Sequence, residues 1–327
     1  MGFTYGVLPC EVVLGTVANL TAVGIWKFGR RSSALPYSTY FFVMALVDCF
    51  ILAFPGTLQM KFIFTPSVLS MVPELCRFHS YFMYASLQCS NVFLTILTIE
   101  RTPTILFPIK FQSKGIKRRS RYVLIITSAI ILLVNIPFLI FTKYDDNFVC
   151  HWGDRFREEL LMFEFIVDVV INTFSTFTIT LTCNIICFIH LCKFRGQATN
   201  DNRSNVLKTF RHLTFATSFT FLVSNFLWIF TIMLILGWLT MAEDDFLSFI
   251  KIADVMLYLN SACNPLIYYI VCIPAREDFK DGFRRVLTAV GREKPTENTE
   301  NGRVKKGDDS DFPKTLSTDF SVDPNFM

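Results

Sequence analysis

One acidic residue stands in the middle of a long apolar stretch of this sequence. Asp48 is flanked by Met44–Val47 on one side and by Cys49–Leu52 on the other. An ionisable group within a membrane costs at least a few kcal/mol, so Asp48 marks a candidate functional site. The alternative is a neutral, hydrogen-bonded aspartic acid that only joins two helices.

The last apolar run ends in a polar segment that contains a proline. Pro265 leaves the carbonyl four residues earlier without its backbone donor, so the helix is expected to bend there. Asn260, Ser261 and Asn264 precede the proline, and in hydrocarbon these side chains need partners or water. The segment is therefore either part of a conformational switch or a structural kink with hydrogen bonds between helices.

An acid–base pair, Glu100-Arg101, stands at one end of the third apolar run, and Pro108 follows shortly after. Such a pair on its own is typical of an interfacial ion pair whose long side chains reach water. Asn19 lies in the middle of the first run, where we expect it to hydrogen-bond a neighbouring helix.

The chain contains no grouping that would support an enzymatic site. Its four histidines are scattered, and it has no glycine-rich loop of the kind that binds phosphate. We therefore expect neither an enzyme nor a nucleic-acid-binding protein.

The elements that position these residues are long apolar helices. Hydrophobic residues make up 52% of the 327 residues. Seven runs nearly free of Asp, Glu, Lys and Arg approach or exceed the length of about 20 residues that spans a bilayer. We predict an all-α membrane protein, a seven-transmembrane helix bundle, with spans at about 7–28, 38–60, 75–107, 121–142, 160–192, 209–237 and 246–273.

The C-terminal part has a different composition. Residues 276–290 alternate apolar and basic side chains and predict a short amphipathic eighth helix on the membrane surface. This helix completes a membrane domain of residues 1–290. Residues 291–327 are polar and charged, and we expect a disordered cytoplasmic tail.

The distribution of positive charge predicts the orientation. The segments after the first, third and fifth spans carry most of the Lys and Arg residues outside the spans and the C-terminal region, whereas those after the second, fourth and sixth carry few. The positive-inside rule then places the N-terminus outside and the C-terminus in the cytosol. The first run lacks a basic leader, so we expect it to be a span and not a cleaved signal peptide.

Two of the ten cysteines stand at the outer ends of spans. Cys76 precedes the third span and Cys150 follows the fourth. Both face the oxidising side in this topology, so a disulfide is permitted and favoured over two free thiols.

These motifs together resemble the rhodopsin-like (class A) G-protein-coupled receptors. The resemblance rests on Asn19, Asp48, Glu100-Arg101 with Pro108, and Asn264-Pro265-x-x-Tyr268, in the family's order. The spacing agrees as well, since Cys76 precedes Arg101 by 25 residues, the family's interval. The match extends over roughly residues 7–290, so it implies the fold of the whole membrane domain.

The resemblance implies a sodium site formed by Asp48, Ser90, Asn260, Ser261 and Asn264. Each of these side chains carries oxygen, the ligand atom that hard cations prefer. We expect sodium or a proton to neutralise Asp48 in the resting state, and no other cofactor.

The family's ligand cavity opens outward between spans three, five, six and seven. Glu164, Asp168 and Asp254 lie towards that side, and the outer loops add further acidic residues. Negative charge at the mouth of a cavity concentrates cations, so a basic or amidated neuropeptide is the expected ligand. The alternative is an acidic surface that only keeps the loops polar.

Several positions in and around the expected cavity differ from the residues that the family usually has there. Met83 replaces the Asp of aminergic relatives and Tyr258 the retinal-binding Lys of opsins, so both ligand classes are disfavoured. In span six, Asn225 and Leu227 replace the family's Trp and Pro, which leaves the outward swing of this helix in doubt. The fourth span lacks the family's tryptophan and the fifth its proline. The sequence is most similar to invertebrate neuropeptide receptors, in particular the nematode FMRFamide-like ones.

The resemblance implies plasma-membrane signalling through a heterotrimeric G protein. Glu100, Arg101 and Pro108 would meet that protein, and Asn264, Pro265 and Tyr268 would form the switch. Arrestin and a receptor kinase would act on the tail, and membrane lipid would surround the bundle. Alternatives are a chemosensory receptor for a small molecule or a seven-span channel or transporter, although the charge count and the isolation of Asp48 disfavour the latter two.

Overall fold

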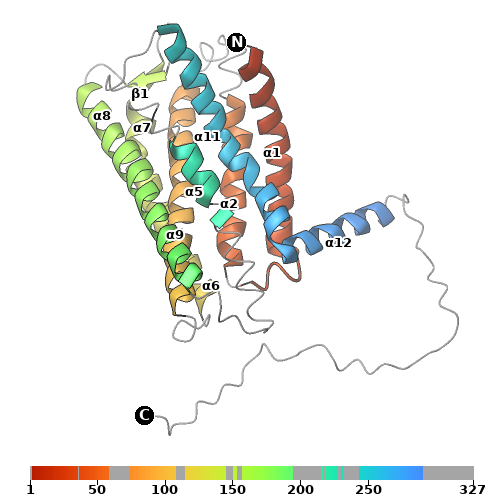
Figure 1. Cartoon of the computed structure of the whole chain (residues 1–327). Coiled ribbons are helices and arrows are strands. Elements are labelled where there is room, and N and C mark those ends of the chain that lie inside the picture. The colour runs from red at the N-terminus through yellow and green to blue at the C-terminus, as the bar shows by residue number, and fades with distance from the viewer. Residues whose placement is uncertain are drawn as a thin grey trace, which may run out of the picture. The chain divides into compact units, whose positions relative to one another are not determined.

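The computed structural model of the chain describes residues 2–35, 37–58, 74–107, 115–144, 150–152, 157–193, 215–216, 218–226, 230 and 243–289. Its α-helices are α1 Gly2–Phe28, α2 Ser38–Ile51, α5 Glu74–Leu106, α6 Ile116–Val134, α7 Ile136–Phe141, α8 Arg157–Glu164, α9 Thr176–Lys193, α11 Glu243–Val271 and α12 Ile273–Ala289. Two π-helical segments, η1 Leu52–Gly56 and η3 Phe165–Ser175, continue α2 and join α8 to α9. This part of the chain forms the predicted all-α membrane bundle (Figure 1).

Five described segments are long and apolar enough to cross a membrane. They are Pro9–Phe28, Ser38–Gly56, Glu74–Leu106, Ile116–Phe141 and Glu158–His190, and they overlap the first five expected spans. Most of the expected sixth span, 209–237, lies outside the described residues, and α11 covers most of the expected seventh. Residues 290–327 are also outside them, so the disordered tail stays a prediction.

A short hairpin lies at one end of the bundle. Strands β1 Thr142–Tyr144 and β2 Cys150–Trp152 pair antiparallel, with Tyr144 opposite Cys150. Both strands contact α5, so the backbone of Cys150 lies on the helix that carries Cys76.

Two spans depart from regular α-helix where the sequence gives a partial reason. Pro55 lies within η1, and its missing amide hydrogen is consistent with a local widening of the helix. Pro137 lies in the first turn of α7, immediately after the break at Asn135 that ends α6. The eleven residues of η3 contain no proline, and the sequence pattern did not predict this long π-helical segment.

The first and last spans pack closely because a glycine lies between them. A Cβ on Gly15 would stand 2.7 Å from Leu52 Cδ1 and 2.8 Å from the Ala262 Cβ, closer than atoms can pack. One turn further in, the Asn19 side-chain amide donates to the Ser261 carbonyl at 3.0 Å, as its place in the first run predicted. Figure 1 shows α11 beside α1, whereas α9 packs on α5.

The loop after α1 is bound to the start of α12. Asp278 accepts hydrogen bonds from the Ser32 hydroxyl at 2.6 Å and the Ser32 amide at 2.8 Å. Arg31 forms ion pairs with Glu277 and Asp281 at 3.2 and 2.8 Å. These contacts lie within the first of two compact units, Met1–Phe283 and Arg284–Met327, and they fix the direction in which the chain leaves α11.

Candidate functional site

The centre of the bundle is organised around the Asp48 carboxyl group, which is fully buried. Ser90 Oγ donates to Asp48 Oδ1 at 2.9 Å, and Asn264 Nδ2 donates to Asp48 Oδ2 at 2.6 Å. The Ser261 side chain lies beside the same carboxyl. The structure therefore joins α2, α5 and α11 at one point through residues that the sequence pattern had grouped.

The donor set around Asp48 suits a hard cation in its chemistry. It offers one carboxylate and two hydroxyls, and Asn264 adds an amide. Asn260 is buried as well, although no described hydrogen bond joins its side chain to Asp48. The residues fit sodium, and Asp48 with Ser90 and Ser261 would hold it.

The inner end of α11 packs through its tyrosine. Tyr268 makes edge-to-face contacts with Trp26 of α1 and Phe41 of α2, at 5.6 and 5.5 Å between ring centroids. Trp26 and Phe41 in turn stack at 4.9 Å. Pro265 lies within the continuous helix α11, one turn before this aromatic cluster.

The acid–base pair at the inner end of α5 is arranged differently from the expected pair of neighbours. Glu100 Oε1 binds Arg119 Nε of α6 at 3.1 Å. Arg101 is buried within the bundle, with only 3% of its surface exposed. The ion pair of Glu100 in the described structure thus joins two spans, because the carboxylate points to α6 while the guanidinium of Arg101 is turned inward.

A series of polar side chains connects α5 with the fifth span. We call it the polar ladder; it consists of Tyr84, Gln88, Asn91 and Thr95 of α5 with Glu164, Asp168, Asn172 and Thr180 of the fifth span. The α5 positions recur every three or four residues and those of the fifth span every four or eight, so the polar side chains gather on one side of each helix.

The contacts within the polar ladder run from the outer towards the inner half. The Tyr84 hydroxyl donates to Glu164. Asn91 Nδ2 donates to Asn172 Oδ1 at 3.4 Å, and Asn172 Nδ2 donates to Asp168 Oδ1 at 3.0 Å. The hydroxyls of Thr95 and Thr180 lie 3.1 Å apart.

The residues expected to bind ligand do not all come together. Asp168 is buried and hydrogen-bonded inside the ladder, whereas Glu164 is half-buried near its outer end. Met83 is half-buried on α5. Tyr258 is buried in a separate cluster with Val12 and Ile51, and thus packs on α1 and α2.

The remaining predicted residues are only partly described. Asn225 is buried, and its side-chain amide donates to the Phe221 carbonyl at 2.9 Å, within its own helix. Pro108 and the side chains of Asp254 and Cys150 lie outside the described residues. Cys76 is disulfide-bonded; its pairing with Cys150 stays a prediction. Among the described residues, no group of three or more His, Cys, Asp and Glu side chains could hold a metal ion.

The sequence interpretation missed several buried polar groups. Gln88 accepts a hydrogen bond from Asn135 of the fourth span at 2.7 Å. Asn91 and Asn172 lie in apolar runs that were read for charge only, so scanning those runs for amides would have found them. Glu11 is 7% exposed, and neither carboxylate oxygen has a hydrogen-bond partner among the described residues. It directly precedes the first charge-free run.

The comparisons with known proteins agree with this arrangement. The family described as 7 transmembrane receptor (rhodopsin family) matches residues 18–268. The Mas-related G-protein coupled receptor member D of Macaca fascicularis is 23% identical over 277 residues, which cover 83% of this chain and 80% of that protein.

Other relatives match shorter parts. A purinoceptor of Gallus gallus is 22% identical over 57% of this chain and 50% of its own length. The cysteinyl leukotriene receptor 1 of Mus musculus is 32% identical over 22% of this chain, and the chain spans only 21% of that receptor. Receptors of this family are not enzymes, and membership of it argues against a channel or a transporter. Because the family match extends over most of the bundle, the chain belongs to the rhodopsin family of seven-transmembrane receptors.

Proposed function

We propose that this protein lies in the plasma membrane with its N-terminus outside and couples an extracellular ligand to a heterotrimeric G protein. The observation that carries the proposal is the contact of Asp48 with Ser90 and Asn264. These hydrogen bonds join spans two, three and seven, so a movement of one span changes the contacts of the other two. The similarity to a Mas-related G-protein coupled receptor supports the same function.

The inner half of the bundle supplies the switch. A ligand shifts the population towards the arrangement for which it has higher affinity. In that arrangement Glu100 leaves Arg119, Arg101 becomes accessible to the G protein, and Tyr268 leaves its contacts with Trp26 and Phe41. Pro265 lets α11 bend between Asn264 and Tyr268. The loop that contains Pro108 adds to the G-protein surface.

The ligand is a basic or amidated neuropeptide of the kind bound by invertebrate receptors. Glu164 is half-buried beside Tyr84 at the outer end of the polar ladder, so it can receive a cationic group from outside. Asp168 lies deeper, accepts a hydrogen bond from Asn172, and adds negative charge further inside the bundle. Asp254, on the outer part of α11, adds negative charge.

A small-molecule ligand is the second candidate, and the names of the relatives favour it. Two of the similar receptors are named for cysteinyl leukotrienes and for purines. A chemosensory or metabolite receptor would use the same switch with a smaller ligand in the outer cavity.

Sodium bound by Asp48, Ser90 and Ser261 would stabilise the resting arrangement, since an ionised carboxylate at mid-membrane requires a counter-charge. Arrestin and a receptor kinase are further expected partners at the C-terminal tail. A disulfide between Cys76 and Cys150 would hold the β1–β2 hairpin against the outer end of α5.

The test is expression in a reporter cell that contains promiscuous G proteins. Basic amidated peptides form one ligand panel, and small anionic metabolites form the other. A response to the first panel, weakened about tenfold by Glu164→Gln, supports the peptide proposal. A response to the second panel alone selects the small-molecule candidate.

The control for coupling uses two arginines of the inner side. Arg101→Ala should abolish the response while surface expression is retained, whereas Arg121→Ala, on an exposed position of α6, should leave it unchanged. A full response from the Arg101 variant would overturn the proposed coupling.

A further inference from the structure

The loop between α1 and α2 contains two serines directly after two arginines, in the order Arg30-Arg31-Ser32-Ser33. The arginines therefore stand three and two residues before Ser33. A protein kinase with an acidic substrate cleft selects a serine by arginines at these intervals, because each guanidinium pairs with a carboxylate of the kinase. The proposed orientation of the chain places this loop in the cytosol, where ATP is present.

The two serines differ in what their hydroxyl groups do. Ser32 is fully buried, and its hydroxyl donates to Asp278 at 2.6 Å. Ser33 is half-buried, and the hydrogen bonds described for it all use its backbone. Its carbonyl accepts from the Ser38 hydroxyl at 3.0 Å and from Lys117 Nζ at 2.7 Å. The hydroxyl of Ser33 is therefore the one that can react.

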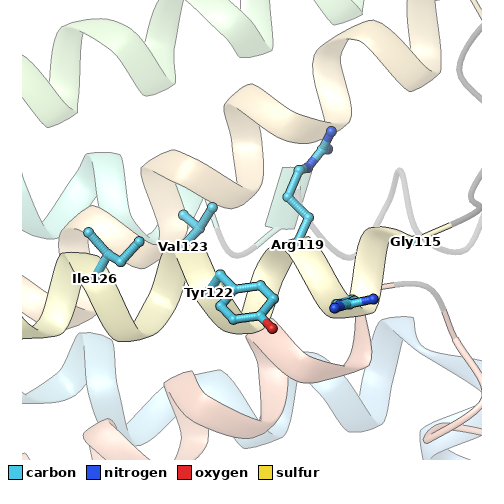
Figure 2. Close-up of a pocket in the computed structure, with 6 residues that line it drawn as sticks. Gly115, Arg119, Tyr122, Val123 and Ile126 are labelled. Atoms are coloured by element: carbon cyan, nitrogen blue, oxygen red, sulfur yellow. The ribbon is translucent and has the colours of Figure 1, made fainter.

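A similar arrangement of charge on α6 shows what a protected serine looks like. The basic residues Lys117–Arg119 directly precede Ser120, which is fully buried and donates to the Ile116 carbonyl at 2.8 Å within the helix. Figure 2 shows the side chain of Arg119 extended from this continuous helix towards the neighbouring span, where it binds Glu100. A kinase cleft takes its substrate as an extended segment, so this helix presents no serine to it.

The loop that carries Ser33 is long enough to leave the surface of the bundle. The nine residues 29–37 join α1 to α2, and these helices pack against each other. Fully extended, nine residues reach about 30 Å, whereas the axes of packed helices lie about 8–10 Å apart. The segment can therefore enter a kinase cleft while both helices stay intact.

The contacts with α12 hold the same arginine that a kinase needs. Arg31 pairs with Glu277 at 3.2 Å and with Asp281 at 2.8 Å, and all three side chains are about half exposed. Ion pairs of this kind are weak. Because one guanidinium cannot serve both sets of carboxylates at once, α12 and the kinase compete for Arg31.

We propose that Ser33 is a phosphorylation site for an arginine-directed protein kinase and that the phosphate releases this loop from α12. The bond between Ser33 Oγ and the γ-phosphorus of ATP forms, the bond from that phosphorus to the bridging oxygen of ADP breaks, and the hydroxyl proton passes to the catalytic carboxylate of the kinase. The phosphate carries a charge of about −1.5 to −2. It attracts Arg31 and Lys117, and it repels the acidic side chains of α12.

The experiment uses the purified full chain in detergent micelles with MgATP and the catalytic subunit of the cAMP-dependent protein kinase as the probe. It requires neither a ligand nor a G protein, so its result is independent of the proposed signalling. Peptide mapping by mass spectrometry should place the phosphate on Ser33. A loop that stays unmodified, or that carries the phosphate on Ser32, would overturn the proposal.

Four variants separate recognition by the kinase from the contact with α12. Ser33→Ala should lose the phosphate of this loop, and Arg30→Gln should slow its incorporation about tenfold. Glu277→Gln combined with Asp281→Asn should speed it about fivefold, because Arg31 is released. The control is Arg284→Gln, an exposed basic position of α12, which should keep the native rate. Equal rates in the Arg30 and Arg284 variants would contradict recognition through Arg30.

Hydrogen exchange tests the release of α12. After phosphorylation of Ser33, the backbone amides of residues 273–281 should exchange faster, to the level found in the unphosphorylated variant that lacks the charges of Glu277 and Asp281. Unchanged exchange in the fully phosphorylated chain would overturn the release. Thermal unfolding of each variant shows whether a change in rate comes from loss of fold, and the mapping on the native chain needs no variant.

Discussion

Glu100 binds Arg119 of the next span, and the adjacent Arg101 is buried in the bundle. The side chains of these two neighbouring residues therefore point to different places: Glu100 contacts α6, and Arg101 is buried in the interior of the bundle. The resting state that this implies is held by an ion pair between spans, so it responds to changes in either helix.

Removing either partner of this ion pair should raise signalling in the absence of ligand. Glu100→Gln and Arg119→Gln break the same contact, and the pair is exposed on the arginine side, so it contributes at most about 1 kcal/mol, or about fivefold in basal activity. G-protein activation at matched surface expression measures the effect. The double variant should equal either single one; additive effects would show that the two residues act separately.

The Asp48 carboxylate should be needed both for stability and for any effect of sodium. Asp48→Ala removes the acceptor of Ser90 and Asn264 and leaves two buried donors unpaired, a cost of about 1–3 kcal/mol for each. The thermal unfolding temperature in sodium chloride should exceed that in N-methylglucamine chloride for the native chain but not for this variant. Asp48→Asn retains an acceptor and should be more stable than Asp48→Ala. An unchanged sodium effect in Asp48→Ala would rule out this site.

The polar ladder should show direct coupling between Asn91 and Asn172. Hydrogen bonds between membrane helices measured by double-mutant cycles average about 0.6 kcal/mol and reach about 1.7 kcal/mol. The cycle of Asn91→Ala and Asn172→Ala, followed by unfolding in detergent, should fall in that range. The pair of Asn91→Ala with Ser128→Ala, on a different span, should be additive and provides the matched control.

The close approach of α1 and α11 can be tested with two glycines of the same helix. Gly15→Ala places a methyl group within 3 Å of Leu52 and Ala262, whereas the same change at Gly24 meets nothing within 4 Å. Overpacking of this kind costs about 1–3 kcal/mol, a loss that is visible in thermal unfolding. Gly24→Ala should be neutral or slightly stabilising. Equal stability of the two variants would contradict the packing described for Gly15.

The disulfide of Cys76 provides a test of the outer end. Peptide mapping without reduction should recover Cys76 linked to Cys150. In the Cys76→Ser variant, the thiol of Cys150 should become free and reactive. Loss of this bond should reduce the fraction of protein at the cell surface, because the β1–β2 hairpin is no longer held to α5. A different partner in the peptide map would correct the pairing.

The sequence was sufficient for the bundle because its signals are long and act locally. Long apolar runs form helices whatever their neighbours are, and the first five of the seven runs overlap described helices long enough to cross a membrane. The pattern around Asp48 and Asn264 identified residues that do meet in space. The spacing of Cys76 and Arg101 added the register of span three. The apolar runs and the spacing can be read from distances along the sequence. The pattern around Asp48 can be read because few residue types place a polar group inside an apolar run.

The features that escaped prediction depend on how side chains turn between helices. The sequence places Glu100 next to Arg101, and only the packing of α5 against α6 reveals that Arg119 is its partner. Asn91 and Asn172 are ordinary single amides in apolar runs, and their role becomes evident only when two helices bring polar faces together. The π-helical segment η3 contains no proline, so no residue in the sequence indicated it.

The contact of Gly15 and Asn19 with α11 has a consequence for the way in which the protein is made. Helix α1 meets α11 only when α11 has entered the membrane, more than two hundred residues later in the chain. Until then the small side of α1 and the Asn19 amide face lipid or a chaperone. A chain that ends before α11 therefore leaves the surface around Gly15 and Asn19 uncovered, and we expect cellular quality control to recognise an unfinished receptor by this surface.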